Sequence, residues 1–191
     1  MSGIDVDLAV NGLITGLFYA LMAIGLSLIF GILKIVNFAH GEFYMVGAYA
    51  YTLIALAFGV PAWVALPLAF VAGAALGWIT ERTLMRPLYA GYTSWGLMRD
   101  EYAVIVTFGL SLFLINLVDK AIGPYAYRGP PLVDASRIVL GPVLISGHRL
   151  LAAGIAIAVI VITAALLKWS VLGQQIRAGS QNRLGASLGG I

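Results

Sequence analysis

The chain has 191 residues, of which 61% are hydrophobic and 10% are charged. Soluble domains carry about 25% charged and about 45–50% apolar residues, so the composition excludes a water-soluble enzyme. It also excludes a disordered chain, because such chains are polar and poor in aromatic residues. The formal net charge of +3 is spread thinly along the sequence and gives no basis for nucleic-acid binding. The composition therefore predicts an integral membrane protein of the all-α class.

Long uncharged runs predict the membrane-spanning helices. A helix crosses the hydrocarbon core of about 30 Å with about 20 apolar residues. The run from 43 to 80 is long enough for two spans, and Gly59 and Pro61 near its middle mark the turn between them. We therefore expect a polytopic bundle of five helices, in a single transmembrane domain over 1–191, with spans at 8–33, 43–58, 62–80, 102–118 and 150–167.

Lysine and arginine predict the orientation, because cytoplasmic loops are rich in these residues. If residues 1–7 lie outside, the inner segments are 34–42, 81–101 and 168–191, and these hold most of the 11 basic residues. Trp78 and Trp169 then fall near the inner interface, where aromatic side chains are common. We expect the N-terminus outside and residue 191 inside.

The predicted outer segment 119–149 is a loop of about 30 residues. Two apolar triplets, 138–140 and 143–145, flank Gly141-Pro142 like a small hairpin. The loop either caps the bundle or serves as a gate or a docking surface for a soluble partner.

Glycines spaced by four predict faces on which helices pack closely, because small residues let membrane helices approach one another. Gly12 and Gly16 lie in the first span, and Gly73 and Gly77 lie in the third.

The residues needed for several chemistries are absent from the sequence. It contains no cysteine, only two histidines and no Gly-Lys pair. These absences exclude disulfides, a site with several histidines, and a phosphate-binding loop for ATP. We expect no catalytic residue, no cofactor and no metal site, and we expect the chain not to be an enzyme.

A polar interruption separates the first two spans. The segment 34–42 holds Asn37, His40 and Glu42 between two apolar runs. A charged side chain at the bilayer centre costs about 2.5–3.5 kcal/mol on insertion scales, so Glu42 lies at an interface or is held inside the protein by partners. Two interpretations remain open: an inner turn in water, or a break within the membrane, which survives only where it is buried or lines a wet cavity.

These residues carry a resemblance to a known family. The sequence is similar to permease subunits of ATP-binding-cassette importers for branched-chain amino acids, and also to urea and short-chain amide permeases. The most specific block is Asn37-Phe38-Ala39-His40-Gly41-Glu42; weaker blocks are Asn11-Gly12-Leu13, Gly25-Leu26, Gly47-Ala48-Tyr49, Glu81-Arg82, Arg86-Pro87-Leu88, Leu172-Gly173, Ile176-Arg177-Ala178 and Gln181-Asn182-Arg183.

The resemblance implies an assembly in the bacterial inner membrane. Two related permease subunits would form the pore, two cytoplasmic ATPase subunits would drive it, and a periplasmic binding protein would deliver the cargo. Asn37, His40 and Glu42 would then lie at or near the translocation path.

The basic tail 168–191 resembles the cytoplasmic loop that contacts the ATPase in that family. Leu184, Leu188 and Ile191 share one face of a short predicted helix, which could otherwise lie on anionic lipid. Importer permeases often carry Glu-Ala-Ala in this loop, and Leu184-Gly185-Ala186 stands there instead. The family also continues into further spans, so we expect the chain to be C-terminally truncated. The residues expected to couple with the ATPase are Arg177, Asn182, Arg183, Leu188 and Gly190.

Two other functions are compatible with the residues alone. A secondary transporter or channel for small polar solutes could run on an ion gradient, with His40 and Glu42 as proton carriers. A membrane scaffold without transport is the third possibility. The cargo, and which polar residues touch it, stay open at this level.

Overall fold

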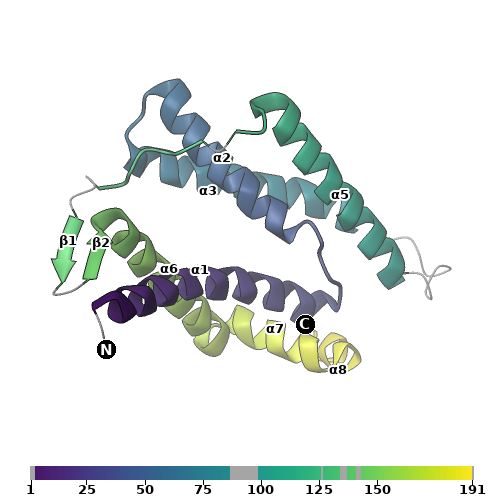
Figure 1. Cartoon of the computed structure of the whole chain (residues 1–191). Helices are drawn as coiled ribbons and strands as arrows, with labels where there is room; N and C mark the ends of the chain where they lie inside the picture. Colours follow the sequence, from purple (N-terminus) through teal and green to yellow (C-terminus); the bar gives the residue numbers. More distant parts are fainter. Residues whose placement is uncertain (1–2, 87–98, 126, 134–136, 141–142, 191) are drawn as a thin grey trace. The chain divides into compact units, whose positions relative to one another are not determined.

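A computed structural model of the chain describes residues 3–86, 99–125, 127–133, 137–140 and 143–190 (Figure 1). Within this part, five helices are long and apolar enough to cross a membrane. They are α1 (Gly3–Leu33), α2 (His40–Phe58), α3 (Ala62–Thr80), α5 (Arg99–Ile122) and α6 (Gly147–Trp169). The prediction of an all-α polytopic membrane protein is confirmed.

The helices extend beyond most of the predicted spans. The uncharged run marks the part suited to lipid, whereas the hydrogen-bonded helix continues through charged residues at its ends. Thus α5 includes Arg99 and Lys120, and α2 begins at His40, so Glu42 lies inside a helix. The bounds of α3 agree with the prediction, and a π-helical turn (η1, Glu81–Met85) continues it. The predicted inner segment 81–101 lies largely outside the described residues.

The chain divides into two compact units. The first, called here the terminal unit, comprises Met1–Lys34 and Val133–Ile191. The second, the central unit, comprises Ile35–Leu132.

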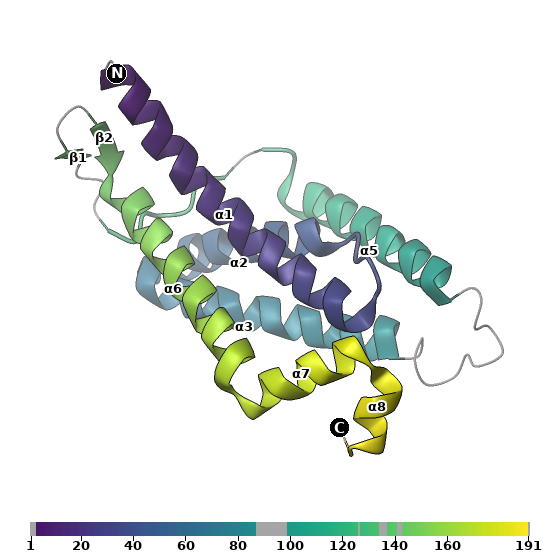
Figure 2. The same ribbon diagram turned by 90° about the horizontal axis from the view of Figure 1, so that it is seen from below.

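The terminal unit is built on α1 and α6, which pack against each other (Figure 2). Ile14 of α1 and Ala153 of α6 form a buried core with Ile145. Val6, Val10 and Leu17 pack around this core. Their spacing places them on the same face of the helix as Ile14.

A small hairpin precedes α6. Strand β1 (Arg137–Leu140) pairs antiparallel with β2 (Val143–Ser146), and Ile138 lies opposite Ile145. The hairpin predicted from the two apolar triplets is therefore confirmed. Ser146 then caps α6, because its hydroxyl accepts a hydrogen bond from the Arg149 amide at 3.4 Å.

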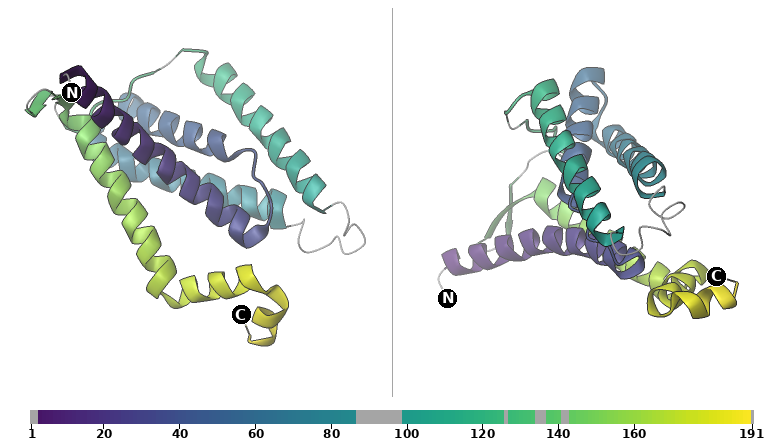
Figure 3. Two further views of the ribbon diagram at one scale, coloured as in Figure 1. Left: turned by 60° about the horizontal axis from the view of Figure 1, so that its bottom comes forward. Right: turned by 90° about the vertical axis from the view of Figure 1, so that its right-hand side faces the viewer.

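The central unit contains α2, α3 and α5 as neighbouring helices (Figure 3). Helices α2 and α3 form a hairpin that turns at Gly59, whose φ of +62° favours glycine. The buried residues of these two helices are small and include Thr52 and Ala55 on α2, and Ala62, Ala65 and Ala69 on α3. Small side chains of this kind allow membrane helices to approach closely.

The four glycines predicted to lie at helix contacts have open space around them. A Cβ added at Gly12, Gly16, Gly73 or Gly77 would meet no atom within 4 Å. Gly12 and Gly16 lie on the face of α1 opposite Ile14 and are exposed. Helix packing through these glycines stays a prediction.

Candidate functional site

The polar interruption is a short break in the helical backbone. Helix α1 ends at Leu33, and the amide of Lys34 donates to the Phe30 carbonyl at 2.9 Å. Lys34 itself has a φ of +57°, a conformation that few residues other than glycine adopt. Residues 34–39 are non-helical, so the break is shorter than the segment 34–42 that the sequence marks as polar.

Asn37 shapes the turn that starts α2. Its side-chain oxygen accepts a hydrogen bond from the Ala39 amide at 3.0 Å, and its carbonyl accepts one from the His40 amide at 3.3 Å. An asparagine that bonds to the backbone two residues on is a common way to build a turn. The half-buried His40 is the first residue of the helix that follows.

The break is attached to α5 through a buried hydroxyl. The amide of Phe38 donates to the side-chain oxygen of Thr107 at 3.2 Å, and this hydroxyl in turn donates to the Ala103 carbonyl at 2.9 Å. Thr107 is fully buried, with 0% of its surface exposed. The ring of Phe38 also packs edge-on against Phe108, with centroids 6.3 Å apart. These contacts satisfy a backbone donor that the break leaves without a helical partner.

Glu42 lies in the first turn of α2, four positions after Phe38, and contacts a second hydroxyl. The Ser111 hydroxyl donates to Oε1 of Glu42 at 2.8 Å. Oε2 of Glu42 is buried and has no hydrogen-bond partner among the described residues. Both this contact and the Phe38–Thr107 contact join residues 69 positions apart, which is the pattern of two parallel helices packed in register.

The position of Ser111 bears on the depth of the site. Ser111 lies near the middle of the uncharged run 102–118, about 14 Å along the helix axis from Tyr102 at 1.5 Å per residue. If α5 spans the bilayer, Glu42 is held beside the middle of that span, where only a buried or cavity-lining group is tolerated. The contact therefore favours a break within the membrane over an inner turn in water.

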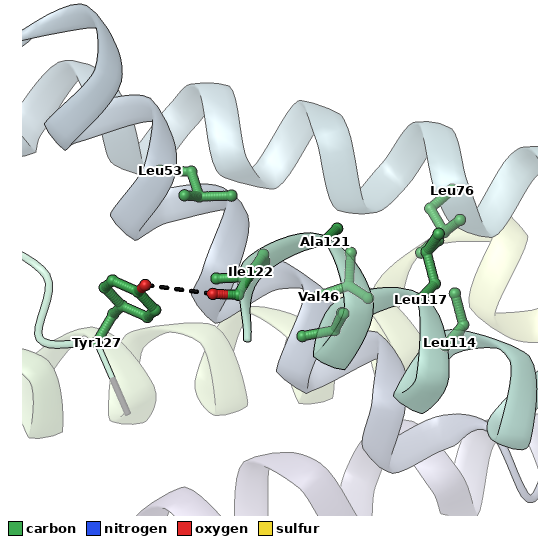
Figure 4. Close-up of a pocket in the computed structure, with 9 residues that line it drawn as sticks. Val46, Leu53, Leu76, Leu114, Leu117, Ala121, Ile122 and Tyr127 are labelled. Carbon is green, nitrogen blue, oxygen red and sulfur yellow. Dashed lines mark hydrogen bonds between the residues drawn. The ribbon is translucent and has the colours of Figure 1, made fainter. Parts of the chain in front are cut away.

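An open apolar pocket of about 510 Å³, called here the cavity, lies on the next turns of the same helices (Figure 4). It is bounded by α2, α3 and α5 and by Tyr127, whose hydroxyl donates to the Ile122 carbonyl at 3.2 Å. Val46 follows Glu42 by one turn, and Leu114 follows Ser111 by one turn. The lining residues are Val46, Leu53, Leu76, Leu114, Leu117, Val118, Ala121, Ile122 and Tyr127.

Sequence reasoning missed this cavity and both hydroxyl groups on α5. A signal was present, because Thr107 and Ser111 are spaced by four in an otherwise apolar span and so share one helix face. In the described part of the chain, no three histidine, aspartate or glutamate side chains are grouped so that they could hold a metal ion.

In the tail, Arg177 and Gly173 fix the angle between two helices. Helix α7 (Val171–Gln181) leaves the end of α6 sharply (Figure 2). The Arg177 guanidinium folds back and donates to the carbonyl oxygens of Leu167 and Lys168 at the end of α6. A positive charge at a helix C-terminus also interacts favourably with the helix dipole. Gly173 is buried, and an added Cβ would collide with the carbonyl of Leu167. Arg177, predicted as an ATPase contact, thus has a structural partner within the chain.

The remaining tail residues lie around α8 (Arg183–Leu188). The side-chain oxygen of Asn182 accepts a hydrogen bond from the Gly185 amide at 3.0 Å and so caps this helix. Leu188 is 88% exposed, and Gly190 follows with a φ of +77°. The side chains of Arg183 and Leu184 lie outside the described part, as does Ile191. The predicted short helix is present, but it ends at Leu188.

Two cation–aromatic contacts lie at helix ends. The Arg82 guanidinium is 5.9 Å from the ring centre of Trp78, and the Lys168 ammonium is 5.5 Å from that of Trp169. Tryptophan beside a basic residue is typical of the boundary between lipid and water.

The five apolar helices define a multi-pass membrane protein. The chain belongs to the family described as branched-chain amino acid transport system / permease component, which matches residues 8–191. The resemblance drawn from the Asn37–Glu42 block is thereby confirmed.

Several relatives carry names that agree with the family. The chain is 34% identical over 137 residues to the high-affinity branched-chain amino acid transport system permease protein LivH of Salmonella typhimurium, covering 68% of this chain and 42% of that protein. It is 38% identical over 117 residues to BraD of Pseudomonas aeruginosa, a permease protein of the same description, covering 57% and 36%. LivM of Salmonella typhimurium is 28% identical over 124 residues, covering 63% and 26%.

The chain therefore aligns with less than half of the length of these relatives. No solved structure matches it significantly.

Proposed function

We propose that the chain forms part of a permease subunit of an ATP-driven importer that carries branched-chain amino acids across the bacterial inner membrane. The observation that carries this proposal is the family match over residues 8–191, together with the LivH and BraD relatives. Transport would proceed by alternating access, and the chain would make and break no covalent bond.

The partners follow from the same assignment. LivH and LivM are both named as permease proteins, which supports a pore made by this subunit and a second, related one. Two cytoplasmic ATPase subunits would supply the energy, and the lack of a phosphate-binding loop in these 191 residues agrees with that division. A periplasmic binding protein would deliver the amino acid.

Within this assembly, the break at residues 34–39 would lie at the translocation path. Glu42 would face the cargo with its unpaired oxygen, whereas Asn37 would act through the turn that it builds. This role of Glu42 is supported by its Oε2 atom, which is buried without a hydrogen-bond partner among the described residues, close to the centre of an apolar span. Buried polar groups without a partner are rare in proteins and often have a functional role.

The tail would transmit movements of the ATPase to the spans. Arg177 and the buried Gly173 join α7 to the end of α6. A displacement of α7 and α8 by the ATPase would therefore be transmitted to α6, with the junction acting as a rigid lever. Leu188 offers an exposed apolar side chain of the kind that docks into a groove of a partner.

The N-terminus would lie outside and residue 190 inside. The excess of basic residues in 34–42, 81–101 and 168–191 supports this orientation, and so do the Trp78–Arg82 and Trp169–Lys168 contacts. Since the sequence has no cysteine, the variants Arg128→Cys and Gln181→Cys can be compared with a thiol reagent that does not cross membranes. Labelling of the first alone in intact cells is expected, and the reverse pattern would overturn the orientation.

Uptake measurements test the transport proposal. A strain lacking this chain should lose uptake of labelled leucine that depends on the binding protein, and the restored gene should recover it, whereas urea uptake should be unaffected. Inactivation of the ATPase subunits should abolish leucine uptake even when the proton gradient is intact. Uptake that survives without the ATPase but collapses with an uncoupler would instead indicate an ion-gradient transporter. Unchanged uptake in the deletion strain would indicate a scaffold.

A further inference from the structure

We propose that the cavity between α2, α3 and α5 holds the aliphatic side chain of the transported amino acid, while the unpaired carboxylate oxygen of Glu42 binds its ammonium group. The cavity and the carboxylate would thus form one amphiphilic site. The inference rests on the proposed function, because it assigns a cargo-binding role to a permease subunit.

The apolar half of the site has the composition that a branched side chain requires. Val46 and Leu53 from α2, Leu76 from α3 and Leu114 from α5 line the space with aliphatic groups. Its volume of about 510 Å³ is within the usual range of about 300–1,000 Å³ for small-molecule sites. Transfer of an aliphatic group from water into such a space is favourable.

The polar half of the site, Glu42 and Ser111, lies one helical turn from residues that line the cavity. Residues three or four positions apart on a helix are neighbours, with Cβ atoms about 5–6 Å apart. Glu42 precedes Val46 by four positions, and Ser111 precedes Leu114 by three. Both members of the hydrogen-bonded pair therefore sit beside residues that line the cavity.

The unpaired oxygen of Glu42 identifies the group that the site would accept. Oε1 is already held by the Ser111 hydroxyl at 2.8 Å, whereas Oε2 is buried and has no partner among the described residues. A carboxylate oxygen accepts hydrogen bonds, and an ammonium group supplies three donors and the opposite charge. An α-amino acid presents this group a short distance from its side chain, which matches a carboxylate beside an aliphatic cavity.

A lipid acyl chain is a weaker match to the same features. The acyl chain would fill the apolar space, but it offers no donor to Oε2 of Glu42. A metal ion lacks further ligands, because no group of three acidic or histidine side chains occurs in the described part of the chain.

Selectivity of the assembled importer gives the first test. Val46→Phe would place a bulkier ring in the cavity and narrow it, so we expect the preference for leucine over alanine, measured by competition for uptake, to fall by about tenfold, the lower end of what a change in an apolar pocket produces. Leu56→Phe is the matched control, because Leu56 is on the same helix, exposed and outside the cavity. Glu42→Gln should weaken leucine and alanine together and leave their ratio unchanged.

Cysteine protection gives a second test that does not depend on a bulky substitution. The sequence has no cysteine, so Val46→Cys introduces one thiol in this subunit, and Leu56→Cys provides the control. We expect leucine to slow labelling of the Val46→Cys variant by a small cationic thiol reagent and to leave the Leu56→Cys variant unaffected. Protection of Val46→Cys by added phospholipid but not by leucine would instead assign the cavity to lipid.

The outcomes separate the inference from the proposed function. If the unmodified importer carries no leucine, the proposed function fails. If it carries leucine, but Val46→Phe and Leu56→Phe retain the same preference and leucine gives no protection, the importer stands and this site is overturned.

Discussion

The Ser111 hydroxyl donates a hydrogen bond of 2.8 Å to one carboxylate oxygen of Glu42, and this contact joins the first helical turn after the break to the apolar middle of α5. One turn earlier on α5, Thr107 receives the Phe38 amide. Two hydroxyls on one helix face thus hold both the backbone of the break and the acidic side chain that follows it. The local geometry of the candidate site depends on α5 as much as on the residues of the break itself.

We predict that Ser111 and Glu42 act on transport as a pair. Glu42→Gln should lower leucine uptake at least tenfold, and Ser111→Ala should lower it by about fivefold, corresponding to about 1 kcal/mol for one hydrogen bond. If the hydroxyl acts by positioning the carboxylate, Ser111→Ala should have little further effect in the Glu42→Gln background, as a double-mutant cycle of uptake rates would show.

Glu101→Gln is the control for this pair, since Glu101 is an exposed glutamate on α5 and receives the same change. Its uptake should equal that of the unmodified chain. Additive losses in the double variant would contradict the proposed positioning role of Ser111.

We predict that Thr107→Val loosens the break. Valine preserves the shape of threonine but removes the oxygen that accepts the Phe38 amide, and an unsatisfied buried donor costs about 1–3 kcal/mol. The Phe38 amide should therefore exchange its hydrogen faster in the variant, and the thermal stability of the detergent-solubilised protein should fall. Thr107→Ser, which retains the hydroxyl, should preserve most of the protection. If the Phe38 amide exchanged as slowly in Thr107→Val as in the unmodified chain, Phe38 would have another acceptor.

The five long apolar helices were predicted correctly because their signal in the sequence is local. Charge-free runs and the Gly59–Pro61 turn can be read directly along the chain, and they located all five apolar helices. The ends of the helices were predicted less accurately, because a helix can continue through charged residues such as Arg99 and Lys120 beyond the uncharged run.

The arrangement of the candidate site could be predicted only in part. Asn37, His40 and Glu42 stand out because they are polar residues in an apolar sequence. The roles of Ser111 and Thr107 depend on which face of α5 packs against α2, and the sequence does not show this. A single hydroxyl within an apolar span does not by itself indicate a site. The buried Ala65, four positions before Ala69 on α3, was not singled out from the sequence either.

We predict that Gly173→Ala disturbs the junction of α6 and α7. The added methyl group would overlap the carbonyl oxygens of Leu166 and Leu167, and overpacking of this kind costs about 1–3 kcal/mol. Thermal stability should fall, and leucine uptake should fall further than stability alone explains, because the proposed lever between ATPase and spans would be displaced. Gly179→Ala is the matched control, because a Cβ there meets no atom within 4 Å. Normal stability and uptake for Gly173→Ala would contradict the tight junction.

We predict that the cap of α8 determines how well the tail binds the ATPase. Asn182→Ala removes the oxygen that accepts the Gly185 amide, and loss of such a cap costs about 0.5–2 kcal/mol. In a six-residue helix this loss should unwind much of α8 and displace Leu188, so less ATPase should co-purify with the permease. Asn182→Asp retains an acceptor at the same position and should recover most of the ATPase. Leu188→Asp should reduce recovery without unwinding the helix. Full recovery with both Asn182→Ala and Leu188→Asp would place the docking surface elsewhere in the subunit.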